Sequence, residues 1–130
     1  MGLVRQLWVD QLDVRVYETP AALAAAAAAE AIATLRMVLD RRGEARMILA
    51  SAASQIRLWE ALTAGRDLEW SRVTLFHMDE YLGLSRDHPG SFRRFLRERV
   101  LSKIQPRVLH EIAGDALEPL KEVERYSALL

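Results

Sequence analysis

Short apolar runs alternate with segments of helical periodicity along most of this chain. Arg46–Ala50 and Val73–His77 are largely apolar and are bounded by residues typical of turns. Such runs are typical of strands buried on both faces of a parallel sheet. Gln55–Ala64 lies between them, has apolar residues at helical spacing, and is followed by Gly65. This order predicts a Rossmann-like α/β fold: an open, mainly parallel sheet with flanking helices and right-handed crossovers.

Further elements continue the alternation on both sides. Leu12–Tyr17 alternates apolar and polar residues, which predicts a strand with one buried face. Thr19 and Pro20 are suited to cap and begin a helix, and Gly43 is suited to end it, so a long helix to about Arg42 is expected. The remaining expected elements are a helix capped by Ser91 and running to about Leu101, a strand over 108–112 and a helix over 118–130.

We find neither an internal repeat nor a linker, so residues 1–130 are expected to form part of a single domain. The last predicted helix reaches Leu130 without a C-terminal cap. On the sequence alone we therefore expect a truncated sheet, with its N-terminal part present here.

Composition restricts the classes of partner. Eighteen basic residues balance eighteen acidic ones, so no electrostatic feature favours nucleic acid or an anionic membrane. The absence of cysteine excludes disulfides and thiolate chemistry and is compatible with the cytoplasm, where we expect the protein. Ala24–Ala29 is too short and too weakly apolar to span a bilayer, and Met1–Asp10 lacks the apolar core of a signal peptide.

Two segments are placed where an α/β sheet binds ligands, at the carboxyl ends of its strands. Ser51, Ala52, Ala53 and Ser54 form a turn of small residues between a predicted strand and a helix N-terminus. Backbone N–H groups and the helix dipole make such a turn suitable for an anion, and the hydroxyls of Ser51 and Ser54 could add donors. Close packing of small residues is the alternative explanation of this turn.

The second segment follows the strand Val73–His77 and carries two adjacent carboxylates, Asp79 and Glu80. Adjacent side chains on an extended backbone point in different directions, so the two are not expected to act as a carboxylate dyad. One could be a general base while the other is structural. A helix cap or a surface charge is the alternative interpretation of either residue.

Other polar and aromatic residues are interpreted as structural. His77, His88 and His110 lack the spacing of metal ligands, so no metal site is expected. Trp59 and Trp70 are expected to pack in the core or at an interface. A basic helix is interpreted as a solvated face, with a phosphate or subunit contact as the alternative; its arginines are Arg93, Arg94, Arg97 and Arg99.

Three stretches together resemble the glucosamine-6-phosphate deaminase/isomerase family. They are Trp-Ser-Arg-Val at 70–73, Phe-His-Met-Asp-Glu-Tyr-Leu-Gly-Leu at 76–84 and Asp-His-Pro-Gly-Ser-Phe-Arg-Arg-Phe-Leu at 87–96. The Met-Asp-Glu-Tyr-x-Gly-Leu stretch with the nearby His-Pro-x-Ser is the most specific part. The resemblance extends from about Leu12 to Leu130.

The resemblance implies conversion of an amino-sugar phosphate, glucosamine 6-phosphate, to fructose 6-phosphate and ammonia, without a metal or organic cofactor. Asp79 matches the family's general base between C1 and C2. The sugar-phosphate loop of the family, Thr-Gly-x-Ser/Thr, corresponds to residues 51–54, and Glu80 is grouped with these as a substrate-binding residue. Alanines stand where the family has glycines, and alanine resists positive φ and adds a Cβ beside the ligand.

The family also has a later Gly-x-Gly-x-x-Gly-His-Ile-Ala-Phe-Asn-Glu motif, which supplies the ring-opening histidine, and a later phosphate-binding lysine. Neither occurs in these 130 residues, so this chain by itself is expected to be inactive. Three alternatives remain open on the sequence. They are a 6-phosphogluconolactonase-like hydrolase, a non-catalytic sugar-phosphate sensor, and a non-functional fragment. Assembly into homo-oligomers is compatible with all but the last.

Overall fold

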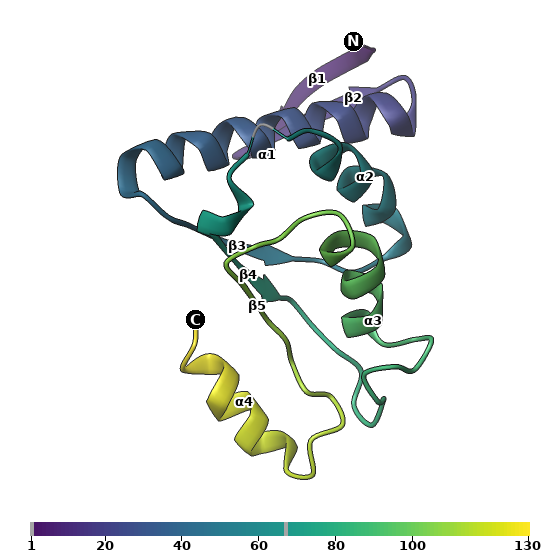
Figure 1. Cartoon of the computed structure of the whole chain (residues 1–130). Coiled ribbons are helices and arrows are strands. Elements are labelled where there is room, and N and C mark those ends of the chain that lie inside the picture. The colour runs from purple at the N-terminus through teal and green to yellow at the C-terminus, as the bar shows by residue number, and fades with distance from the viewer. Residues whose placement is uncertain (1, 67) are drawn as a thin grey trace.

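The computed structural model describes residues 2–66 and 68–130 (Figure 1). Its strands and helices are β1 Leu3–Val9, β2 Leu12–Tyr17, α1 Pro20–Arg42, β3 Ala45–Leu49, α2 Ile56–Ala64, β4 Val73–His77, α3 Phe92–Leu96, β5 Val108–His110 and α4 Pro119–Ser127. Short helical turns precede α2 and β4, and a π-helical turn, Arg97–Leu101, continues α3. The predicted elements therefore all occur, most of them with bounds within two residues of those expected.

Strands β3, β4 and β5 form a parallel sheet in that order, with Leu49 paired with His77 and Phe76 paired with His110. Helices connect consecutive strands, as the α/β prediction required. β3 occupies Ala45–Leu49 rather than Arg46–Ala50, a shift of one residue. The Rossmann-like α/β expectation is confirmed.

The core lies on one face of this sheet. Val73 and Leu75 of β4 are fully buried there, among buried residues of α1, α2 and α3. Trp59 and Trp70 belong to the same core, as expected. Figure 1 shows α4 on the other side of the sheet from these helices, where Tyr126 packs edge-on against Phe76 of β4.

Both ends of α1 have the caps that the sequence predicts. The Thr19 hydroxyl accepts a hydrogen bond from the Ala22 N–H, and Gly43 takes the left-handed conformation with φ 78°. Arg72 also donates to the Leu39 and Gly43 carbonyl oxygens at 3.0 and 2.7 Å. The guanidinium thus adds a second donor to the Leu39 carbonyl, which also accepts from the Gly43 N–H, and it ties the end of α1 to the beginning of β4.

The N-terminal hairpin differs from the expectation. Leu3–Val9 is a strand that the sequence interpretation missed, while Met1 lies outside the described residues. It pairs antiparallel with β2, which does not join the parallel sheet. Arg5 inside the segment and Asp10 after it obscured the strand, and Asp10 makes the tight turn at φ 53°.

Within the described ranges, α1 is the one helix long and apolar enough to cross a membrane, by length and composition only. Its alanine-rich surface packs against α2, and Ala24, Ala28, Leu35 and Leu39 are buried. Packing in the domain accounts for these apolar residues.

The Gly43 cap leads to a first prediction. Replacing Gly43 by alanine places a Cβ on a left-handed residue, and we expect the free energy of unfolding to fall by about 1 kcal/mol. Gly65 has φ −84° and no atom within 4 Å of an added Cβ, so Gly65→Ala is the matched control. Urea unfolding of both variants measures the difference. Equal stabilities would contradict the prediction.

Candidate functional site

The turn Ser51–Ser54 and the Asp79 loop leave neighbouring strands at the same edge of the sheet. Leu49 of β3 lies opposite His77 of β4, and the Met78 N–H donates to the Leu49 carbonyl oxygen at 3.0 Å. The ladder therefore extends one residue beyond β4, up to Asp79. Both segments lie at the carboxyl ends of parallel strands, the usual ligand position in such sheets.

Asp79 is exposed, whereas the Glu80 side chain has no exposed surface. The two carboxylates thus have opposite environments, as expected for adjacent residues leaving a strand. On one side Asp79 is held by the Met78 ladder bond, and on the other by the buried Glu80. Its backbone is consequently fixed while its carboxylate remains accessible.

The Glu80 carboxylate is held by donors from the beginning of α3. One oxygen accepts from the Phe92 N–H at 3.0 Å, and the other from the Ser91 hydroxyl at 2.7 Å and the Arg93 N–H at 3.1 Å. The Tyr81 N–H and the Arg93 guanidinium complete the set at 3.0 and 3.3 Å. A carboxylate has about four sites that can accept hydrogen bonds, so these donors occupy all of them.

Glu80 is therefore the N-terminal cap of α3, a role expected of Ser91. The Ser91 side chain makes no capping hydrogen bond and instead donates to Glu80. Burial by itself raises the pKa of the Glu80 carboxyl, but the hydrogen bonds from Phe92, Ser91, Arg93 and Tyr81 outweigh it and lower that pKa below its ordinary value. The carboxylate is ionised at neutral pH, and its charge suits a helix N-terminus.

Arg93 is buried and contradicts the interpretation of the basic segment as a solvated face, whereas Arg99 is exposed and agrees with it. Arg93 is 5% exposed. Its guanidinium donates to the Leu84 carbonyl oxygen at 2.8 Å and to Asp115 at 2.9 Å, in addition to Glu80. Two neighbouring arginines also form ion pairs, Arg94 with Glu98 and Arg97 with Asp87. Arg93, Arg94 and Arg97 are thus each paired with an acidic side chain of the protein.

The Ser51–Ser54 turn leads into a 3₁₀ turn, Ala53–Gln55, and then α2. Ser51 is 3% exposed, and its hydroxyl has no hydrogen-bond partner among the described residues. Ala52 has φ −146°, and Ala53 does not have positive φ. The concern that alanine would resist the backbone conformation is thus removed, and only the added Cβ groups distinguish this turn from a glycine-containing one.

His77 ends β4 beneath the two segments and is 1% exposed. Its Nδ1 accepts from the Ile112 N–H at 3.4 Å, while Nε2 has no partner among the described residues. Burial lowers the pKa of His77, although the carboxylates of Glu80, Asp79 and Glu111 act in the opposite direction. His77 is therefore neutral at physiological pH, with its proton on Nε2.

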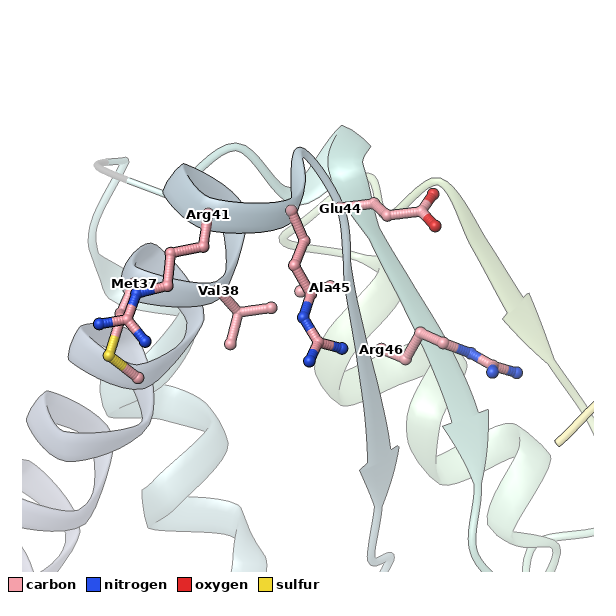
Figure 2. Close-up of a pocket in the computed structure, with 7 residues that line it drawn as sticks. Met37, Val38, Arg41, Glu44, Ala45 and Arg46 are labelled. Atoms are coloured by element: carbon pink, nitrogen blue, oxygen red, sulfur yellow. The ribbon is translucent and has the colours of Figure 1, made fainter.

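A cavity of about 430 Å³ begins at Asp79 and continues between the segment after β5 and α4, where Tyr126 and Val123 line it. A second, of about 520 Å³, lies between the end of α1 and β3 (Figure 2). Figure 2 shows Arg41 and Arg46 extending away from each other there, so their charges do not converge. Of these two cavities, the first adjoins the carboxyl edge of the sheet.

No cluster of three or more potential metal ligands occurs within residues 2–66 and 68–130. The residues that the sequence interpretation missed are Gly114, Asp115 and Tyr126. Gly114 lies against Glu80 and Tyr81, Asp115 accepts from the Arg93 guanidinium, and the Tyr126 hydroxyl donates to the His77 carbonyl oxygen. A Gly-Asp pair after a strand is a common turn signal, so no pattern marked these residues as part of the site.

A family model for glucosamine-6-phosphate isomerases/6-phosphogluconolactonase matches residues 18–130. The chain belongs to this family. The glucosamine-6-phosphate isomerase/6-phosphogluconolactonase match begins after β2, so the N-terminal hairpin precedes it.

Curated relatives agree with this assignment. A glucosamine-6-phosphate deaminase of an Exiguobacterium species is 40% identical over 63 residues, which are 48% of this chain and 25% of that protein. Glucosamine-6-phosphate deaminase 2 of Bacillus subtilis (strain 168) is 32% identical over 88 residues, 64% of this chain and 35% of that protein.

Solved structures share the fold. A monomeric glucosamine-6-phosphate deaminase matches 85% of this chain and 46% of its own, with TM-score 0.76 and 25% identity. A 6-phosphogluconolactonase from Shewanella baltica OS155 matches 88% of this chain and 48% of its own, with TM-score 0.74 and 22% identity. The chain thus spans about half the length of these structures, and its matched segments cover 25% and 35% of the two curated relatives.

The Glu80 cap leads to a second prediction. Glu80→Gln leaves Arg93 without its buried partner and supplies amide hydrogens where acceptors are needed, so we expect a loss of about 3 kcal/mol in unfolding free energy near pH 7. Because the pKa of Glu80 is lowered in the folded state, its contribution is complete above the ordinary value of 4.5 and disappears as the pH falls below it.

Urea unfolding at pH 7 and at pH 3 measures this contribution. Glu98→Gln is the matched control, since Glu98 is an exposed partner of Arg94 in the same helical segment. A Glu80→Gln protein as stable as Glu98→Gln at pH 7 would show that the cap is dispensable.

His77 leads to a third prediction, for the range above the Glu80 transition. Its lowered pKa means that the unfolded chain binds more protons as the pH falls below the ordinary value of 6.5. Stability should therefore decrease on acidification from pH 7.5 to 5.5, and less so in His77→Gln. His88→Gln, at an exposed histidine, should keep the wild-type decrease. Parallel unfolding curves for His77→Gln and wild type across this range would refute the assignment.

Proposed function

We propose that this chain carries the proton-transfer part of a glucosamine-6-phosphate deaminase active site, with Asp79 as the general base. The observation that carries the proposal is the contrast between an accessible Asp79 carboxylate and a backbone anchored on both sides of it. Curated relatives named as glucosamine-6-phosphate deaminases support the choice of reaction. Because the chain matches 46% of the solved deaminase, the activity is proposed for the whole family domain and not for these 130 residues alone.

The chemistry assigned to Asp79 is narrow. Its carboxylate removes the C2 proton of the open-chain amino sugar, and the electron pair moves to the C1–C2 bond as the C1 oxygen gains a proton. Return of a proton to C1 leaves a C2 imine, which water hydrolyses to the ketose phosphate with release of ammonia. The substrate's own carbonyl delocalises the charge, so the step requires no cofactor. Fixing the base removes much of the entropy cost of this transfer.

The Ser51–Ser54 turn is proposed to hold the sugar phosphate. Its support is the buried Ser51 hydroxyl, which has no partner within residues 2–66 and 68–130, together with the following helix N-terminus. Glu80 is better suited to positioning than to substrate contact, because protein donors occupy its carboxylate. A cytoplasmic location and a homo-oligomer are compatible with this function.

Hydrolysis of 6-phosphogluconolactone is the second candidate. Solved lactonases with the same fold favour it. The sequence Met-Asp-Glu-Tyr around Asp79 favours the deaminase. The fate of the C2 hydrogen distinguishes the two reactions. A lactonase opens an ester with water and leaves this hydrogen in place.

Asp79→Asn is the fourth prediction. Asparagine keeps the size of the side chain but cannot accept the proton, so we expect turnover of glucosamine 6-phosphate to fall by about 10²- to 10⁴-fold with binding nearly unchanged. Exchange of the C2 hydrogen with solvent deuterium, followed by NMR in the full-length protein, measures the step directly.

The matched control is Asp87→Asn, which changes an exposed aspartate in the same connection between β4 and α3. It should retain wild-type exchange. Exchange that persists in Asp79→Asn would reject Asp79 as the base. A wild-type protein that lacks C2 exchange but hydrolyses 6-phosphogluconolactone would replace the deaminase by the lactonase.

A further inference from the structure

We propose that Gly114 and Asp115, in the segment after β5, are positioning residues for Asp79, with Arg93 as the connection between Asp115 and the Asp79 loop. The proposal rests on the function proposed for Asp79. None of the three residues is placed in contact with substrate. Their task is to hold the backbone that presents the base.

Gly114 lies directly against the residues that follow Asp79. A Cβ on Gly114 would lie 2.2 Å from the Tyr81 carbonyl oxygen and 2.7 Å from Glu80 Cγ. Real Cβ atoms do not approach backbone this closely, so glycine is required here by space. The Gly83 N–H also donates to the Gly114 carbonyl oxygen at 2.8 Å. Two loops from different strands are thus in backbone contact beside the base.

Arg93 adds a charged connection between the same two loops. One guanidinium nitrogen donates both to the Leu84 carbonyl oxygen and to Asp115, and another donates to Glu80. The planar fork of arginine reaches these acceptors together, and the single ammonium of lysine cannot. Asp115 is partly exposed, with 42% of its side chain accessible, so the connection can be altered there without opening the core.

The segment that carries Gly114 is itself anchored to α4. The Ala113 N–H donates to Glu122 at 2.7 Å, and Arg125 donates to the Glu111 carbonyl oxygen at 2.9 Å. The hydrogen bond from Arg125 lowers the pKa of Glu122 to about 2, so the carboxylate accepting from Ala113 stays ionised. Helix α4 therefore supports the loop that in turn supports the base. A displacement of about 1 Å at a catalytic group can cost on the order of 10²-fold in rate.

The experiment compares Gly114→Ala and Asp115→Asn with Gly65→Ala and Asp87→Asn in the full-length protein. We expect Gly114→Ala to lower kcat by about 10²-fold and Asp115→Asn by several-fold, with KM changed less than about threefold in each. Asp115→Glu should recover most of the loss, because it restores the charge facing Arg93. The controls should keep wild-type kcat.

Amide hydrogen exchange at Met78, Tyr81 and Gly83, whose N–H groups are hydrogen-bonded, provides a readout that needs no activity. It should accelerate in Gly114→Ala and Asp115→Asn and not in the controls. If Gly114→Ala fails to fold, the comparison of Asp115→Asn with Asp115→Glu tests the positioning role by itself. Unchanged kcat and unchanged exchange in Asp115→Asn would overturn the positioning role. Accelerated exchange in a protein without C2-exchange activity would support the positioning role and reject only the proposed function.

Discussion

The buried carboxylate of Glu80 is the interaction on which this edge of the molecule depends. It caps α3, pairs with the equally buried Arg93 and fixes the first turn of the chain after β4. A buried charge is stable only when its acceptors and donors are satisfied, and here both partners are. Removing either would leave the other desolvated and unpaired, so the loop, the helix start and the pair form a single cooperative unit.

The buried Glu80 also fixes the position of the adjacent Asp79. A general base needs a defined position but also access to its substrate, and a flexible loop supplies only the second. Here the ladder bond of Met78 and the burial of Glu80 fix the main chain on both sides, while Asp79 itself remains exposed. Two adjacent carboxylates therefore divide the work between structure and proposed chemistry. Their directions differ simply because they leave an extended strand.

The likeness to both deaminases and lactonases shows how little the fold alone says about the reaction. A parallel sheet with a small-residue turn after β3 and a polar loop after β4 is suited to either of the two proposed reactions. What distinguishes the reactions is the group presented at that edge. The proposed chemistry rests on two features of this chain: the accessible Asp79, and the Ser51 hydroxyl, which has no partner in the part of the chain that the structure describes.

Local sequence signals determined the helices and strands of the family domain, because Thr19, Pro20, Gly43 and the apolar run Val73–His77 act through backbone sterics and burial within a few residues. They also determined that Asp79 and Glu80 would have different roles. Only the tertiary structure decided three other features. They are the position of Glu80 at the start of α3, the burial of Arg93 and the contact of Gly114 with Tyr81. Those contacts join residues distant in sequence, and no local periodicity records which donor a carboxylate will meet once loops from separate strands are packed together.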